Sequence, residues 1–267
     1  MPDFLYEWPI WISGSAIFVA IVASALICLY LVRRHLLPRL DLRQEHELYR
    51  ATMVQSMMVF YGLLAALLSV NVYTTYSEAS RIVSREATGL AALYRDVSSY
   101  PEPARSRLQS RIRDYVHEII DKSWPLQRHG IIPEHGVAVV DAIQSELTVF
   151  EPADEAQKAL HSETLRAYNS MIEARNLRLD VNRDGMPFLM WVTLLMGAVF
   201  CLFGACFFNV SEPRLHFLFQ GLLASIFAII LFMTFAWDRP FRGDLGVDSR
   251  PYQIVYDHLM KRHEVKP

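Results

Sequence analysis

The chain has 267 residues, of which 52% are hydrophobic and 20% are charged, a balance too apolar for an ordinary soluble domain of this length. Its 26 basic and 28 acidic residues give a formal net charge of −2, so no global positive field exists to attract nucleic acid. The three cysteines, Cys28, Cys201 and Cys206, all lie in apolar runs, where they indicate neither a disulfide nor a zinc site.

Four apolar stretches are long enough to cross a bilayer as helices, which takes roughly 20 residues. They run from Ile10 to Val32, from about Met53 to Tyr73, from about Pro187 to Val210 and from Leu215 to Trp237. The first is too long for a signal peptide and is preceded by acidic rather than basic residues, so we predict a retained helix. The linker 211–214 between the last two spans is short enough to force an antiparallel hairpin.

Residues 74–186, between the second and third spans, have ordinary charge content and helical periodicity. The second span is predicted to continue out of the bilayer to Ser98, because the stretch has no proline before Pro101. Helices are also expected at about 104–123, ending at Trp124-Pro125, at about 134–150, and at 153–182 with Pro152 in the first turn. Two apolar stripes define their inner faces: Leu108, Ile112, Tyr115, Val116, Ile119 and Ile120, then Val137, Val140, Ile143 and Leu147.

These features predict an all-α membrane protein with four transmembrane helices and a helical soluble domain between the second and third spans, both of which extend into that domain. The segments are an amino-terminal flank (1–9), spans one and two with an Arg-rich loop (10–73), the soluble domain (74–186), a membrane hairpin (187–237) and a carboxyl-terminal segment (238–267). The plain expectation is a multi-pass protein of a bacterial plasma membrane. Arginines flank the spans on both sides in similar numbers, so the positive-inside rule leaves the side of the soluble domain open.

No nucleophile elbow, metalloprotease motif, phosphate-binding loop or dinucleotide turn is present in the sequence, so we expect neither an enzyme nor a cofactor. No two histidines of the soluble domain are spaced for one helical metal site. Glu78, Arg81, Arg85 and Glu86 lie within about two turns of one helix and are interpreted as surface pairs that support structure rather than handle ions.

Polar residues near the ends of two spans admit two interpretations each. Ser69 and Asn71 either bond a neighbouring helix or face water, and both options imply a face turned away from lipid. After the fourth span, Asp238, Asp244 and Asp248 could clasp a hard cation. The arginines among them, Arg239 and Arg242, favour salt-bridged docking of this segment onto the soluble domain, so no metal site is predicted.

Several of these segments resemble the bestrophin-like family of bacterial and plant membrane proteins, a domain of unknown function. The resemblance covers about Val59 to Tyr256 and rests on four runs: Leu68 to Ala79, Arg85-Glu86-Ala87 with Leu93-Tyr94-Arg95, Ala174 to Leu179, and Asp238-Arg239-Pro240-Phe241-Arg242-Gly243-Asp244-Leu245. More remotely, the exit of the second span and the turn at Pro240-Phe241 are similar to regions of true bestrophins.

True bestrophins are oligomeric ion channels, pentameric where known, whose second helix lines a narrow apolar neck and whose helical domain is cytoplasmic. By position, the resemblance implies a neck at Gly62, Ala66 and Val70, with Asn71 beside it. These residues are smaller than a tight hydrophobic gate needs, which leaves a wider pore, another lining face or no pore as alternatives. Arg242 also departs from the metal clasp of some animal bestrophins.

Two hypotheses follow. The first is a homo-oligomeric channel, a tetramer or pentamer, that passes small inorganic ions, with anions expected, through an axial pore lined by the second span. The second is a non-conducting membrane-anchored interaction or sensor protein, whose helical domain binds a partner or ligand and whose Gly62 and Ala66 serve close helix packing. The lipid bilayer is a partner in both.

Overall fold

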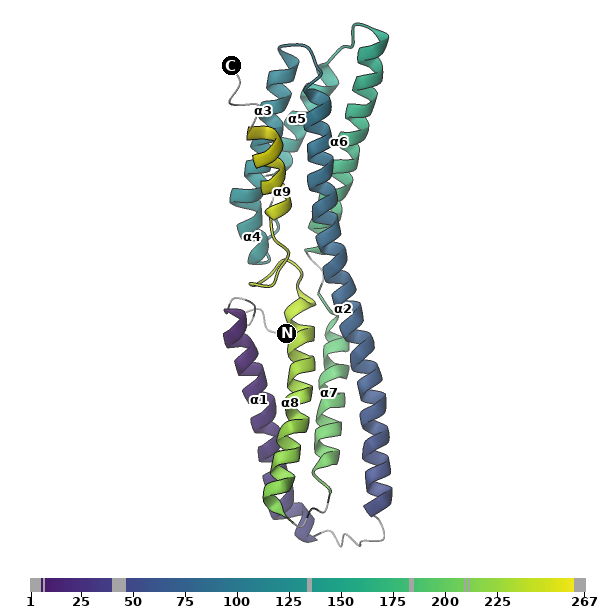
Figure 1. Ribbon diagram of the computed structural model, residues 1–267, viewed down its shortest axis with the longest axis vertical. Coiled ribbons are helices and arrows are strands. Elements are labelled where there is room, and N and C mark those ends of the chain that lie inside the picture. The colour runs from purple at the N-terminus through teal and green to yellow at the C-terminus, as the bar shows by residue number, and fades with distance from the viewer. Residues whose placement is uncertain are drawn as a thin grey trace. The chain divides into compact units, whose positions relative to one another are not determined.

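The computed structural model describes residues 6, 8–39, 47–133, 136–182, 185–208, 210 and 212–261. These residues form helices and short connections and contain no strand (Figure 1). Four helices are long and apolar enough to cross a membrane, which confirms the predicted all-α membrane fold. The chain divides into a membrane unit, Met1–Thr74 with Gly185–Arg239, and a helical unit, Thr75–Asp184 with Pro240–Pro267.

The membrane unit contains α1 (Ile10–Leu31), the first half of α2, α7 (Phe188–Ala205) and α8 (Pro213–Asp238). Helix α8 packs against both α1 and α7, and α1 also contacts α7. The hairpin between α7 and α8 is wider than the predicted linker at 211–214, because α7 ends at Ala205 and α8 begins at Pro213. Proline suits that first position, since its missing N–H has no partner inside the helix.

Helix α2 (Glu47–Val97) is the longest element, with 51 residues and a length of about 77 Å at 1.5 Å per residue. This confirms the prediction that the second span continues as one rod beyond the bilayer. Within its most apolar window only 17% of residues are buried, the same share as in the first span, compared with 28% for α7 and 33% for α8. The membrane half of α2 therefore leaves most of its surface without protein contact.

The helical unit holds the second half of α2 together with α3 (Ala104–His117), α4 (Trp124–Arg128), α5 (Gly136–Val149), α6 (Glu155–Val181) and α9 (Arg250–Val255). The predicted stop at Trp124-Pro125 is wrong. A wide π-helical turn, Glu118–Ser123, leads directly into α4, where Pro125 stands in the first turn and no intrahelical N–H is required.

Helix α6 also begins later than predicted. The Asp154 side chain accepts a hydrogen bond of 2.7 Å from the Gln157 backbone N–H, which satisfies one of the free donors of the first turn. In return, the Gln157 amide oxygen accepts from the Ala153 N–H at 3.0 Å. This reciprocal cap fixes the start of the helix, and Pro152 lies outside it.

The core of the helical unit contains most of the predicted apolar stripe. Leu108, Ile112, Tyr115, Val116 and Ile119 are buried, and Ile120 is half-buried. Val137 was predicted to face inward but is 49% exposed. The carboxyl-terminal segment, predicted as a separate part, supplies α9 to this unit and buries Tyr252 completely.

Candidate pore face and its supporting contacts

The predicted neck residues lie on the exposed side of α2. At about 100° per residue, Gly62, Ala66 and Val70 fall within roughly 80° of one another on the helix. All three are exposed in the single chain, Val70 by 61%. A Cβ built on Gly62 meets no atom within 4 Å, so this part of the face is open.

The buried side of α2 in the membrane unit is a narrow stripe of Val54, Tyr61, Ala65 and Val72. Val70 is nine positions after Tyr61, which is about 180° around the helix axis. The side chains of Tyr61 and Val70 therefore point in opposite directions. Asn71 lies about 100° around the helix from Val70 and is also exposed. One side of helix α2 thus packs against the rest of the membrane unit, and the other side is exposed.

Three contacts between α2 and the α7 and α8 hairpin involve Tyr61 and Ser69. The Tyr61 ring stacks on Phe227 of α8, with centroids 4.9 Å apart and an interplanar angle of 13°. The same ring lies against Gly197 of α7, where a Cβ would come within 2.5 Å of it. The Ser69 and Thr234 hydroxyl oxygens lie 3.1 Å apart, so Ser69 bonds a neighbouring helix, one of the two roles expected for it.

Asp238 is the last residue of α8 and belongs to the membrane unit. Its carboxylate accepts hydrogen bonds from the Tyr6 hydroxyl at 2.7 Å, the Trp191 indole at 3.3 Å and the backbone N–H of Met186. The residue is 4% exposed. The hypothesis that this aspartate docks onto the soluble domain is therefore wrong, because its donors come from the amino-terminal flank, from α7 and from Met186 just before α7, all in the membrane unit. Arg239, the next residue, lies against Gly185 of the same unit.

A buried carboxylate organises the helical unit. Glu86 of α2 is fully buried and accepts two hydrogen bonds from the Arg178 guanidinium, at 2.6 and 3.2 Å. The hydroxyls of Tyr115 and Tyr252 donate to the same carboxylate at 2.9 Å each. Four hydrogen bonds from three other elements thus converge on one side chain of α2.

The protonation states of this cluster support the arrangement. Burial raises the pKa of Tyr115 and Tyr252 well above the ordinary value, and the Glu86 charge adds to this effect, so both phenols remain donors. Burial by itself would lower the pKa of Arg178, but the charge and hydrogen bonds of Glu86 outweigh it and the pKa is raised. Arg178 also lies over the Trp124 ring at 5.9 Å.

The predicted surface pairs on α2 are partly correct. Glu78 and Arg81 form an exposed pair at 3.8 Å, and Arg85 is exposed. Glu86, however, was interpreted as a member of this surface set and is instead in the core. Its partner lies 92 residues away in sequence, beyond the reach of helical spacing rules.

The carboxyl-terminal turn docks onto the helical unit through Phe241 and Arg242. The Phe241 ring is buried and meets Trp124 edge to face, with centroids 5.8 Å apart. The Arg242 guanidinium lies directly over Gly130, which has a φ of +74°. These two residues thus dock through an aromatic contact and a close approach to a glycine, whereas the predicted salt-bridged docking is seen at Asp248, whose carboxylate lies 3.9 Å from the Arg128 guanidinium. Asp244 is exposed, and no cluster of three metal-ligating side chains occurs in the described part of the chain.

The family model of the bestrophin-like domain matches residues 19–252, which is most of the chain. The chain belongs to the bestrophin-like family. No curated protein matches it. Among solved structures, the chain is similar to a singly substituted bacterial bestrophin homologue from Klebsiella pneumoniae, with a TM-score of 0.69 and 11% identity over 93% of this chain and 98% of the other. A second substituted form of that homologue gives 0.64 at 12% identity over 91% and 97%.

A third structure, described as a membrane protein, has a TM-score of 0.70 at 12% identity and covers 94% of this bestrophin-like chain and 98% of its own. At this level of identity the matches establish the fold.

The residues that sequence reasoning missed are the hydrogen-bond donors to Glu86, which are Arg178, Tyr115 and Tyr252. Arg178 stands in the Ala174 to Leu179 run that carries the resemblance, and an arginine between apolar residues on a helix was the available signal.

Proposed function

We infer that this bestrophin-like chain is a subunit of an oligomeric channel that conducts small ions, with anions preferred, through an axial pore lined by the membrane half of α2. The observation that carries this proposal is the exposed face of α2 at Gly62, Ala66 and Val70, which lies about 100–180° around the helix from Tyr61 of the buried stripe. A ring of four or five such subunits would turn these faces toward a common axis. In this reading the protein acts by conduction rather than catalysis and resides in a bacterial inner membrane.

The preference for anions is supported by charge on the exposed part of α2 in the helical unit. Arg85 and Arg95 are exposed and make no ion pair among the described residues. Exposed cations along a helix that borders a pore would raise the local anion concentration.

The test uses cysteine modification in proteoliposomes. Cys28, Cys201 and Cys206 are replaced by alanine, and Val70→Cys is introduced in this background. We expect a bulky thiol reagent to reduce chloride flux to that of empty vesicles. The matched control is Val199→Cys on α7, which is 58% exposed and outside α2, and its modification should leave flux unchanged.

The oligomeric state is measured in parallel by light scattering corrected for bound detergent. A ring of four or more subunits with flux blocked only at Val70→Cys supports the proposal. A monomer or dimer without flux contradicts it and favours the interaction or sensor protein, in which the open surface at Gly62 and Ala66 packs against another helix. A reversal potential that follows the cation gradient would contradict the anion preference alone.

A further inference from the structure

Two adjoining apolar hollows lie where α2 begins and the α7 and α8 hairpin turns. One has a volume of about 350 Å³ and is lined by residues of α2, the hairpin and α8, among them Met58, Phe208, Phe219 and Leu223. The other, of about 430 Å³, runs along α2 from Ala51 to Val59 and also reaches Phe208. Met58 and Phe208 line both hollows.

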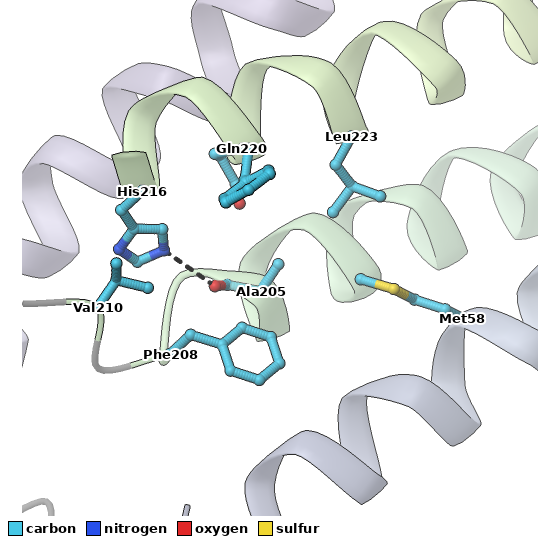
Figure 2. A pocket seen from close by; sticks show the side chains of 8 residues that line it. Met58, Ala205, Phe208, Val210, His216, Gln220 and Leu223 are labelled. Carbon is cyan, nitrogen blue, oxygen red and sulfur yellow. Dashed lines mark hydrogen bonds between the residues drawn. The ribbon is translucent and has the colours of Figure 1, made fainter. Parts of the chain in front are cut away.

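The polar groups in the wall of the first hollow are already hydrogen-bonded, to backbone carbonyls and, at the Nδ1 of His216, to the Arg33 guanidinium at 3.1 Å. Figure 2 shows His216 reaching the carbonyl of Ala205, at 3.3 Å. The Gln220 amide donates to the Leu202 carbonyl at 3.0 Å. The wall therefore presents an apolar surface, which suits a hydrocarbon chain better than water.

Two arginines contact the α7 and α8 hairpin beside the hollows. Arg50 immediately precedes Ala51, and its Nη1 lies 3.4 Å from the Phe207 carbonyl oxygen. Its Nε and Nη2 atoms are shielded from solvent and have no hydrogen-bond partner among the described residues. Arg33 approaches the same hairpin, with Nη1 at 3.3 Å from the Val210 carbonyl oxygen. Neither arginine has an ion pair among the residues that the structure describes.

We propose that an anionic phospholipid binds here, with its phosphate on Arg50 and Arg33 and an acyl chain in the two apolar hollows. Guanidinium groups bind phosphate through paired, charge-assisted hydrogen bonds, and basic pockets between membrane helices are known sites for anionic headgroups. The Arg50 guanidinium, with two donor atoms that lack partners among the described residues, suits the phosphate of such a lipid. The neighbouring apolar hollows suit its acyl chain. This inference depends on membrane insertion and not on the proposed conduction.

The experiment measures lipid retention by native mass spectrometry of the full chain purified in detergent. The protein is supplied with phosphatidylglycerol or phosphatidylcholine of identical acyl chains. Wild type is expected to retain phosphatidylglycerol about tenfold better, the size of one charge-assisted contact. Arg50→Gln should remove that preference. Arg50→Lys, which keeps the charge, should retain part of it.

Arg34→Gln is the matched charge control, because Arg34 is adjacent to Arg33 but bonds the exposed Tyr30 hydroxyl at 2.7 Å. It should behave as wild type. Met58→Trp fills the shared wall without changing charge and should lower retention of both lipids. Circular dichroism and gel filtration of each variant identify any that fail to fold.

Four results would overturn the proposal. The first is equal retention of the two lipids by wild type, and the second is undiminished phosphatidylglycerol binding by correctly folded Arg50→Gln. The third is displacement of phosphatidylglycerol by glycerol phosphate at the same concentration, which would indicate a site for a free anion. Crosslinking between copies through Met58→Cys, with no lipid retained, would instead assign the groove to a second subunit.

Discussion

Replacing Glu86 by glutamine tests the buried cluster most directly. Gln preserves the shape of the side chain but leaves the Arg178 charge without a counter-charge at a site where Glu86 is 0% and Arg178 is 2% exposed. Removing one partner of a buried ion pair costs about 3–5 kcal/mol. We therefore expect Glu86→Gln to lower the free energy of unfolding of the helical unit by about that amount.

The control is Glu78→Gln, which removes a carboxylate from the same helix. Its pair with Arg81 spans 3.8 Å between side chains that are 52% and 76% exposed, so the expected cost is about 0–1 kcal/mol. Tyr252→Phe removes one of the four hydrogen bonds to Glu86 and should fall between the two, at about 1.5–3 kcal/mol.

Hydrogen exchange followed by mass spectrometry is the appropriate assay, because it gives opening free energies for the helical unit separately from the membrane unit. The double variant Glu86→Leu with Arg178→Met should cost less than the sum of its single variants, since no buried charge remains. The reasoning is refuted if Glu86→Gln opens no more easily than Glu78→Gln, or if the double variant costs the full sum.

Two further changes test local packing and titration. Gly130→Ala should destabilise the helical unit by about 1–2 kcal/mol, because a φ of +74° strains alanine and the new Cβ meets the Arg242 guanidinium. The control is Gly62→Ala, whose Cβ meets no atom within 4 Å. Equal thermal midpoints of the two variants would contradict the expected destabilisation. Burial lowers the pKa of His161, whose Nδ1 lies 2.7 Å from the Tyr100 hydroxyl oxygen. The unfolded chain then binds more protons, so stability is lost as the pH falls below about 6.5. His161→Gln should reduce the fall in thermal midpoint between about pH 7.5 and 5.5, and an unchanged fall would contradict the assignment.

The sequence predicted features that depend on local periodicity. The four spans follow from hydropathy alone, and the single rod of α2 follows from the absence of proline before Pro101. The stripe that includes Tyr115 is predicted by spacings of three and four residues. The family resemblance predicted a pore neck at Gly62, Ala66 and Val70, and this stays a prediction; in the single chain Gly62 and Val70 are exposed.

The features that the sequence did not predict depend on contacts between distant segments. Helical spacing placed Glu86 with its surface neighbours, whereas its partner Arg178 comes from α6. Asp238 was placed with the arginines that follow it, but its donors are Tyr6, Trp191 and Met186. Periodicity cannot identify such pairs, because a buried carboxylate is recognised by the donors that surround it and those come from other elements.

Helix α2 combines two different environments, and this difference bears on the proposed channel. In the helical unit its inner side is fully buried at Val83, Leu90, Leu93 and Tyr94 and holds the Glu86 cluster. In the membrane unit it is held by one narrow stripe centred on Tyr61 and Ala65. In the proposed channel, neighbouring subunits would complete the packing of this open half of α2. Conduction along Val70 should therefore depend on assembly, and a variant that remains monomeric should lose flux even when its own fold is intact.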